Sequence, residues 1–445
     1  DVIPASGKVY AEVWYKTKVE YPYTYKETKY TGKKKEVFLI KFLNNKFKFF
    51  DFKPFKTSLN EEIVLIKDNI CNILYFFYLC YNPSMTIAID CRVLDSSGIG
   101  VFLRECLLRF NSQNVSLLLI GSAEKIKKLS LKNASILECN IKTFSLKELF
   151  CFPKSLLKQI NKCDAYFTPY FNIPSGIKIP VFSTIHDMIF PDMPELTSKI
   201  GLMARMFFYR RASKKSNLIF TVSKFSEERI KHFLPKAKKT KVIYNGLSKY
   251  IINSLENYSF EEKKDDYILF VGNIKKHKGL KTLITAFTKA KQNGFNKKLF
   301  IVGNAENFRT KDTEIASLIE SAPKDSINFT GFLSDKELLS CLKNADLLVQ
   351  PSLYEGFGIP PLEAMSLGTP ALISDIPVFK EIYEFFPVTY FKTEDSDDLC
   401  TKLINMYKNI DNLPRIQLTS EQKDKYTYDK TANLILQTIM ENLWK

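Results

Sequence analysis

The residues best suited to chemistry lie in one segment around residue 355. Residues 350–365 read QPSLYEGFGIPPLEAM, so two carboxylates flank a glycine-rich turn and two prolines that suit the first turn of a helix. A strand, a tight loop and a helix start present backbone N–H groups and a positive dipole end to an anion. The segment therefore predicts a site for a phosphate-bearing ligand. Its candidate ligand-binding residues are Glu355, Gly356, Phe357, Gly358, Ile359 and Glu363.

The two carboxylates allow more than one interpretation. The acid and base of a glycoside hydrolase lie about 5 to 9.5 Å apart. Glu355 and Glu363 are eight residues apart, which spans about 12 Å in a helix, so this interpretation requires the chain to fold back. We favour carboxylates that accept hydrogen bonds from sugar hydroxyls. The structural alternative is a pair of acids that complement a helix dipole.

A cation that could offset this acidic site occurs earlier, in the sequence VGNIKKHKGL of residues 271–280. Lys278 follows an apolar run there and can reach phosphate oxygens as a point charge, with Asn273 in the same turn. A lysine-rich turn by itself is most often a solvated loop. Its occurrence in the same half of the chain as the glutamate segment favours a shared site.

The first half of the chain offers weaker candidates. His186 ends an apolar run beside Asp187, so we expect a hydrogen-bonding group whose tautomer Asp187 influences. A satisfied structural histidine is the alternative. Gly98 and Gly100 stand between a strand pattern and a helix pattern, which is typical of a close backbone approach but weak alone.

The elements that must position these residues follow one rhythm, in which short apolar runs alternate with longer helical patterns. Runs that are apolar on both faces indicate parallel sheets. We predict an α/β protein of two doubly wound domains that face a cleft, at residues 85–255 and 256–425, with a helix in 426–445 that packs back across them. Residues 1–82 alternate with a period of two and predict a small β-rich appended segment. The predicted strands cover residues 85–90, 115–121, 165–168, 181–186, 218–222, 242–244, 267–272, 299–303, 327–330, 347–350 and 371–374.

Composition narrows the class of protein. The 445 residues carry a net charge of +17, which favours an anionic partner. Nine cysteines without a C-x-x-C pair indicate neither a disulfide framework nor a zinc site. No apolar stretch reaches the roughly 20 residues of a membrane span, and no leader pattern follows Asp1. We therefore expect a cytoplasmic protein, with a peripheral position at the inner face of the membrane left open.

Taken together, these motifs resemble the retaining GT-B glycosyltransferases of family 4, and within them the bacterial mannosyltransferase-like branch. The resemblance covers residues 85–445 and keeps the order of the family's motifs. The glutamate segment is its most specific part. Residues 1–15 weakly resemble a segment of a sporulation membrane protein. The matching pieces are IAIDCR (87–92), GIG (98–100), PYFNIP (169–174), TIHD (184–187), TVSKFS (221–226), NG (245–246), VGNIKKHK (271–278), FTGFL (329–333) and YEGFGIPPLE (354–363).

The resemblance implies transfer of a hexose, with mannose favoured, from a GDP or UDP sugar to a glycan or lipid-linked acceptor hydroxyl. It implies retention of anomeric configuration, polysaccharide biosynthesis as the setting, and neither a metal nor a cofactor. Glu355 would contact the donor sugar near its reacting carbon, Glu363 would hold the ribose, and Lys278 would stabilise the diphosphate. His186 would contact the donor sugar from the opposite domain. Gly98 and Gly100 would approach the diphosphate or the acceptor.

Three alternatives remain at this point. Many family members carry Arg where this chain has Asn273, so a catalytically weak, nucleotide-sugar-binding regulatory protein is the second hypothesis. Nucleic-acid binding by the lysine-rich first 82 residues is not expected, because scattered Lys and Tyr suit a solvated sheet face better. The helix predicted at residues 196–215 mixes basic and aromatic residues, which favours peripheral membrane contact and packing against the first sheet equally.

Overall fold

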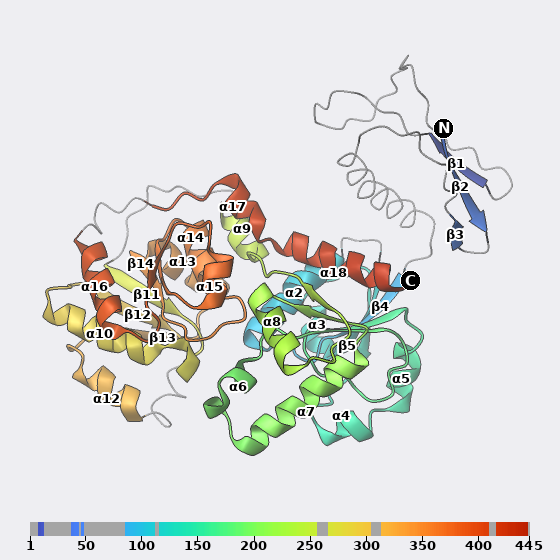
Figure 1. Ribbon diagram of the computed structural model, residues 1–445, viewed down its shortest axis with the longest axis horizontal. Helices are drawn as coiled ribbons and strands as arrows, with labels where there is room; N and C mark the ends of the chain where they lie inside the picture. Colours follow the sequence, from blue (N-terminus) through green and yellow to red (C-terminus); the bar gives the residue numbers. More distant parts are fainter. Residues whose placement is uncertain are drawn as a thin grey trace, which may run out of the picture. The chain divides into compact units, whose positions relative to one another are not determined.

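The computed structural model describes residues 8–12, 37–43, 46–48, 85–111, 115–255, 266–303, 313–408 and 415–443. The chain divides into two compact units, residues 1–80 and residues 81–445. In the first unit, β1 (Lys8–Glu12), β2 (Val37–Leu43) and β3 (Lys46–Lys48) form an antiparallel sheet of three strands. Figure 1 shows all described elements.

The second unit begins with a parallel sheet of seven strands in the order β10-β9-β8-β7-β4-β5-β6. The apolar runs form its centre, where strands covered on both faces must be apolar throughout. Its strands are β4 (Met85–Asp90), β5 (Val115–Gly121), β6 (Ala134–Glu138), β7 (Ala165–Thr168), β8 (Val181–Thr184), β9 (Leu218–Thr221) and β10 (Thr240–Val242). Its helices are α2 (Ser97–Phe110), α3 (Ala123–Lys127), α4 (Leu146–Phe150), α5 (Lys154–Ile160), α6 (Ile189–Asp192), η1 (Pro194–Leu196), α7 (Lys199–Lys215) and α8 (Lys224–Phe233). Helix α9 (Lys249–Leu255) follows β10 and contributes Ile251 to the core of the second half.

The second half of this unit repeats the plan with a parallel sheet of six strands, β13-β12-β11-β14-β15-β16. The expected fold class of two Rossmann-like α/β domains is therefore confirmed. The strands are β11 (Tyr267–Val271), β12 (Lys298–Val302), β13 (Ile327–Gly331), β14 (Leu347–Gln350), β15 (Ala371–Ser374) and β16 (Val388–Phe391). The helices are η2 (Lys276–Lys278), α10 (Leu280–Gln292), α12 (Thr313–Ser321), α13 (Asp335–Asn344), α14 (Pro360–Ser366), α15 (Pro377–Ile382), α16 (Ser396–Tyr407) and α17 (Ser420–Lys425).

The core of the second domain lies on both faces of its sheet. Successive side chains of β11 point to opposite faces and pack in different apolar clusters. Ile268 and Phe270 pack with α10 and α16, whereas Tyr267 and Leu269 pack with the residues of α14 and α15. Both clusters consist of fully buried aliphatic and aromatic side chains. The sheet is thus held between two apolar layers, and its carboxyl edge is left to the loops.

The chain passes between the two domains at two adjacent places. After β10 it runs through residues 245–248 into α9, and the final helix α18 (Tyr428–Leu443) returns and packs on α2 of the first domain (Figure 1). The backbone N–H of Leu247 donates to the carbonyl of Tyr426 at 3.1 Å. A Cβ on Gly246 would lie 2.3 Å from the carbonyl carbon of Thr427, so only glycine permits this approach. No helix in the described ranges combines the length and apolar character that a membrane crossing requires.

Candidate active site

Glycines allow the loops at the carboxyl edge of the second sheet to pack closely, and one of them, Gly279, brings the lysine turn against the glutamate loop. Gly279 follows η2 with a φ of +69°, and a Cβ there would lie 1.8 Å from the carbonyl oxygen of Pro351. Gly272 and Gly303 form a similar pair, because a Cβ on Gly303 would lie 2.5 Å from the Gly272 carbonyl oxygen. Glycine at these positions lets the loops after neighbouring strands pack backbone to backbone.

Lys278 and Glu355 meet as a result of this packing. The Lys278 Nζ lies 2.7 Å from Oε1 and 2.8 Å from Oε2 of Glu355, and both side chains are largely but not completely buried. The Ser352 hydroxyl donates to Glu355 Oε1 at 2.7 Å. An ammonium has three hydrogens, so the pair still leaves Lys278 a donor for an incoming anion.

The first domain meets this loop through its own backbone. A Cβ on Gly356 would lie 2.5 Å from the His186 carbonyl oxygen. The Ser223 hydroxyl donates to the Gly356 carbonyl at 2.7 Å, and the Ser226 hydroxyl donates to the His186 carbonyl at 3.0 Å. The residue after Glu355 therefore lies against the first domain at His186.

The His186 ring makes a different contact from the one the sequence suggests. Its Nε2 lies 2.9 Å from the Pro169 carbonyl oxygen, and a carbonyl can only accept, so Nε2 carries the proton. Burial lowers the pKa of His186 to about 4, although the bond to Pro169 opposes this shift. Asp187 does not set the tautomer as expected, because its Oδ1 accepts from the Ile189 backbone N–H at 3.1 Å. His186 is thus a neutral imidazole with Nδ1 as its acceptor.

Asp187 adds a second acidic group near the Lys278–Glu355 pair. Burial and the negative charge of Glu355 raise the pKa of Asp187, while the Ile189 N–H, Lys278 and Lys275 lower it in part. The effect of Glu355 and Lys278 on Asp187 indicates that charges of the second domain act on the first domain at this point. No sequence motif links Asp187 to Glu355, because the two residues come close only where the domains approach each other.

Glu363 occupies a separate position on α14. Burial and the negative charges of Asp335 and Glu105 raise the pKa of Glu363 to about 7. Glu105 belongs to α2 of the first domain, so Glu363 also lies where the domains approach each other. Lys278, Glu355 and the His186 backbone lie together, and among the described residues Glu363 takes no part in the hydrogen bonds of the Lys278–Glu355 pair.

The remaining predicted residues differ in their surroundings. Phe357 is buried in the apolar core and meets Tyr426 edge-on at 5.3 Å, so only its backbone could serve a ligand. Gly358 has a φ of +84°, and Ile359 precedes α14 as its N-cap.

The predicted glycines of the first domain differ from each other. A Cβ on Gly100 would lie 2.3 Å from the Leu94 carbonyl oxygen, whereas one on Gly98 would meet nothing within 4 Å. Asn273 is exposed in the turn before η2.

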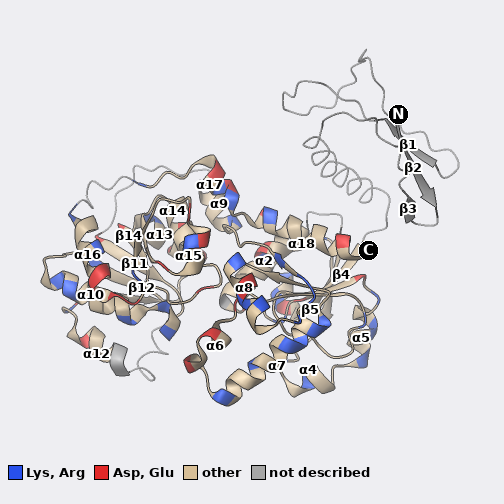
Figure 2. Cartoon of the chain, viewed as in Figure 1, with Lys and Arg blue, Asp and Glu red and all other residues tan. Residues whose placement is uncertain are grey.

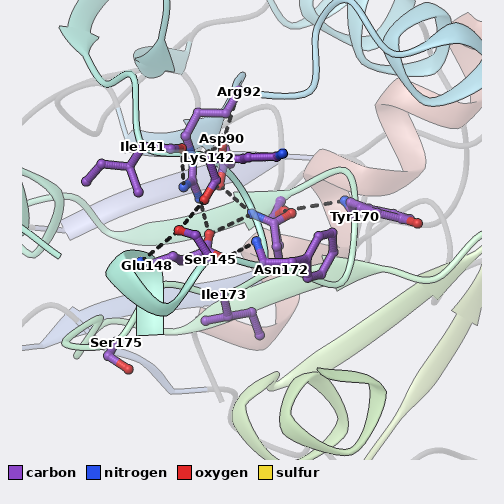
Figure 3. A network of polar contacts seen from close by, with 12 residues as sticks. Asp90, Arg92, Ile141, Lys142, Ser145, Glu148, Tyr170, Asn172, Ile173 and Ser175 are labelled. Atoms are coloured by element: carbon purple, nitrogen blue, oxygen red, sulfur yellow. Dashed lines mark hydrogen bonds and ion pairs between the residues drawn. The ribbon is translucent and has the colours of Figure 1, made fainter. Parts of the chain in front are cut away.

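A buried polar network that the sequence reasoning missed organises the carboxyl edge of the first sheet (Figure 3). Arg92 Nη2 lies 2.5 Å from Asp90 Oδ2 and 2.6 Å from Glu148 Oε1. The Asn172 amide and the Tyr166 hydroxyl donate to Asp90 at 2.9 and 2.7 Å. Burial opposes the ionisation of Asp90, but Arg92 outweighs it and lowers the pKa of Asp90. Asp90 and Arg92 lie in the IAIDCR motif and Asn172 in PYFNIP, which was the available signal, whereas Glu148 lies in neither motif.

Two further contacts join the domains around this site. The Tyr354 hydroxyl donates to Asp192 Oδ2 of the first domain at 2.8 Å. The Glu381 carboxylate accepts from the backbone N–H groups of Lys224 and Phe225, each at 2.8 Å. Glu381 therefore caps helix α8 from the opposite domain, where an acid complements the helix dipole. Among the described residues, no group of three or more His, Cys, Asp or Glu is placed to hold a metal ion.

Part of the sequence matches a known family of proteins. Residues 254–416 match the model of "Glycosyl transferases group 1". This segment contains the lysine turn, the glutamate loop and the helix that carries Glu363. The carboxyl-terminal domain is therefore similar in sequence to the group 1 glycosyltransferases. Residues 1–70 match a different model, "Putative stage IV sporulation protein YqfD", which agrees with the weak resemblance noted at the start of the chain.

Curated relatives of this chain include named sugar transferases. The chain is 28% identical over 257 residues to the O-antigen chain mannosyltransferase RfbU of Salmonella typhimurium, which covers 57% of this chain and 67% of that protein. It is 36% identical over 176 residues to an uncharacterized glycosyltransferase of Methanocaldococcus jannaschii, covering 37% of this chain and 44% of that protein. The matched part of the chain thus spans about two thirds of the first relative and less than half of the second. They support a mannosyltransferase-like glycosyltransferase.

Solved structures confirm the GT-B fold of the glycosyltransferase unit. A glycosyltransferase from Rickettsia africae aligns with a TM-score of 0.63 at 15% identity, over 81% of this chain and 99% of the other. Anabaena Alr3699/HepE, solved in complex with UDP-glucose, aligns with a TM-score of 0.61 at 16% identity, over 80% of this chain and all of the other. At this identity the likeness establishes the fold.

Proposed function

We propose that the protein transfers a hexose, with mannose favoured, from a nucleotide diphosphate sugar to an acceptor hydroxyl on a glycan or lipid-linked saccharide. The observation that carries the proposal is the Lys278–Glu355 pair, which lies on loops of the second domain against the His186 backbone of the first. It combines a cation for a diphosphate with an acceptor for sugar hydroxyls.

The reaction we propose keeps the anomeric configuration and needs no metal. The bond between the anomeric carbon and the donor phosphate oxygen breaks, and the acceptor oxygen forms the new bond on the same face. The acceptor proton passes to the leaving phosphate oxygen, so no side-chain base is required. Lys278 offsets the charge that develops on the diphosphate, and preorganised cations of this kind supply a large part of catalysis.

The other side chains have supporting roles in this proposal. Glu355 accepts hydrogen bonds from the donor sugar, and backbone N–H groups of residues 356–358 bind sugar or phosphate. Glu363 accepts from the ribose hydroxyls. Neutral His186 offers Nδ1 to a sugar hydroxyl from the first domain. The domain identity, the mannosyltransferase relatives and the GT-B fold support these assignments.

A panel of GDP and UDP sugars tests the proposal in two steps. Thermal stabilisation identifies the donor, because a ligand that binds only the folded state raises the apparent stability. Transfer to glycan acceptors is then measured, with the anomeric configuration of the product read by NMR. Transfer with retention supports the proposal. Tight donor binding without hydrolysis or transfer would instead identify a nucleotide-sugar-binding regulatory protein.

A further inference from the structure

Bulky apolar side chains gather on one surface of the first domain. Seven large apolar side chains are strongly exposed in the described part of the chain, and five of them lie on α4 and α7. The other two, Phe332 and Phe385, lie in the second domain. The five are Leu146 (73% exposed), Phe150 (76%), Ile200 (80%), Met203 (72%) and Phe207 (52%).

Helix α7 has two distinct faces. Tyr209, Ala212 and Ser213 are buried and pack toward the first sheet. The opposite face forms a shallow groove whose residues recur every three or four positions, the spacing of one helix face. The groove is lined by Leu202, Met203, Met206, Phe207, Arg210, Arg211, Lys214 and Lys215.

Helix α4 extends this face. The ring of Phe144, just before α4, meets Phe208 of α7 edge-on at 4.8 Å. Arg211 donates to the Ser175 hydroxyl at 3.0 Å, and the Ser175 N–H donates to the Glu148 carbonyl on α4 at 3.2 Å. The two helices lie side by side in Figure 1. Their five exposed apolar side chains and the exposed cations beside them form the α4–α7 surface.

The charge on the α4–α7 surface has one sign. Helix α7 contains six basic residues and no acid (Figure 2). The single acid of α4, Glu148, is buried against Arg92 and contributes nothing to the surface. The exposed cations are Lys147, Lys199, Arg210, Lys214 and Lys215.

From this arrangement we infer that the α4–α7 surface docks on an anionic phospholipid bilayer. Its exposed apolar side chains enter the boundary between headgroups and acyl chains, while Lys and Arg on the same helix contact lipid phosphates. A protein partner fits less well, because the centres of protein interfaces are depleted in lysine. The inference goes beyond sugar transfer and holds whether or not the proposed reaction is correct.

The test is co-sedimentation of the full chain with vesicles. Binding is expected to vesicles of equimolar phosphatidylcholine and phosphatidylglycerol and to fall with salt, whereas phosphatidylcholine alone should bind weakly. The double variants Met203→Ser/Phe207→Ser and Lys214→Glu/Lys215→Glu should each lower the partition coefficient roughly tenfold or more.

Each variant has a matched control elsewhere on the protein. Phe385→Ser removes an exposed apolar side chain from the second domain, and Lys238→Glu/Lys239→Glu reverses an exposed lysine pair outside the surface. Both controls should bind like the parent chain, and all variants should keep its thermal unfolding midpoint. Failure of the parent chain to bind, or equal losses in variants and controls, would overturn the inference. So would a dimer that Met203→Ser/Phe207→Ser dissociates, in a chain that does not bind vesicles.

Discussion

Lys278 and Glu355 form the kind of contact that constrains both partners. Each side chain is mostly buried, so removing one leaves the other with an incompletely satisfied charge. Ser352 holds one carboxylate oxygen in place, and the turn at Gly279 fixes the backbone that carries Lys278. In the proposed reaction, the donor would meet a cation and an acceptor whose positions are already set.

Replacing either member of the pair should remove most of the transfer activity. Lys278→Ala and Glu355→Gln are each expected to lower kcat by roughly 10²- to 10³-fold, because electrostatic stabilisation of the leaving diphosphate and fixation of the sugar are lost. The measurement is initial-rate kinetics with the identified donor. Lys276→Ala, which removes an exposed charge from the same turn, is the control and should keep near-parental kcat. Near-normal turnover in Lys278→Ala or Glu355→Gln would contradict the assigned roles.

Glu363 should make stability depend on pH. Its pKa of about 7 in the folded protein exceeds the usual value near 4.5, so the folded state binds more protons between these limits. The favourable contribution is complete below pH 4.5 and is lost as pH rises through about 7. Glu363→Gln should therefore raise the free energy of unfolding at pH 8, relative to the parent chain, by roughly 1 to 2 kcal/mol after allowance for solvent screening.

Urea denaturation of parent and variant at pH 5 and pH 8 measures this difference. At pH 5 the difference between the two chains should be much smaller than at pH 8, since the parent carboxyl is then protonated in the folded state and the pH lies only slightly above its usual pKa. Comparing variant with parent at each pH removes the contributions of other titrating groups, including His186. A difference that is the same at both pH values would show that Glu363 titrates normally.

At the level of elements, the passage between the domains depends on one glycine. A Cβ on Gly246 would overlap the backbone of Thr427 and the N of Tyr428, both parts of the returning segment. Backbone cannot move aside as a flexible side-chain tip can. The position of α18 on α2 therefore relies on a residue without a side chain.

Gly246→Ala should destabilise the protein by roughly 2 kcal/mol, because the added methyl forces two packed backbones apart. Chemical denaturation followed by circular dichroism measures the change. Gly98→Ala serves as the stability control, since a Cβ there meets nothing within 4 Å and alanine is the better helix former. Equal stability of the Gly246 variant and the parent would mean that the two segments are not packed as described.

The elements that the sequence predicts best are the buried central strands. The predicted runs at 85–90, 115–121, 165–168, 347–350 and 371–374 coincide with β4, β5, β7, β14 and β15, because strands covered on both faces are continuously apolar. The edge strands β6 and β16 were missed, since only one residue of each strand is fully buried and neither forms a continuous apolar run. For β10 the predicted range 242–244 was wrong, and the strand covers Thr240–Val242, where Lys241 is exposed.

The sequence motifs predicted which residues belong to the candidate site, but they did not predict how these residues contact one another. Lys278 and Glu355 meet because the backbone packs closely at Gly279. The φ of +69° at this glycine is visible in the structure, but the sequence does not show which glycines adopt such a conformation. The bond from His186 to Pro169 and the cap from Glu381 to α8 join residues 17 and over 150 positions apart. Contacts of this kind follow from tertiary structure and have no local pattern.

At the scale of the whole molecule, Glu381 forms one of the hydrogen-bonded contacts between the two domains. Glu381→Ala should release the first turn of α8 and weaken domain contact by about 1 kcal/mol, the usual contribution of a helix cap. Small-angle X-ray scattering of the ligand-free chain should then give a larger radius of gyration. Glu384→Ala, which removes an exposed acid just past α15, the helix that carries Glu381, should leave the scattering unchanged. Identical scattering from Glu381→Ala and the parent would show that this carboxylate does not hold the domains together.

Both covalent links between the domains pass side by side, where Leu247 pairs with Thr427. Two links at one location leave the domains free to rotate about an axis through that location but resist sliding and twisting. We therefore expect the domains to move relative to each other mainly by rotation about this axis. One pair of spectroscopic probes, placed across the far side of the axis, would be enough to record the full course of opening and closing during turnover.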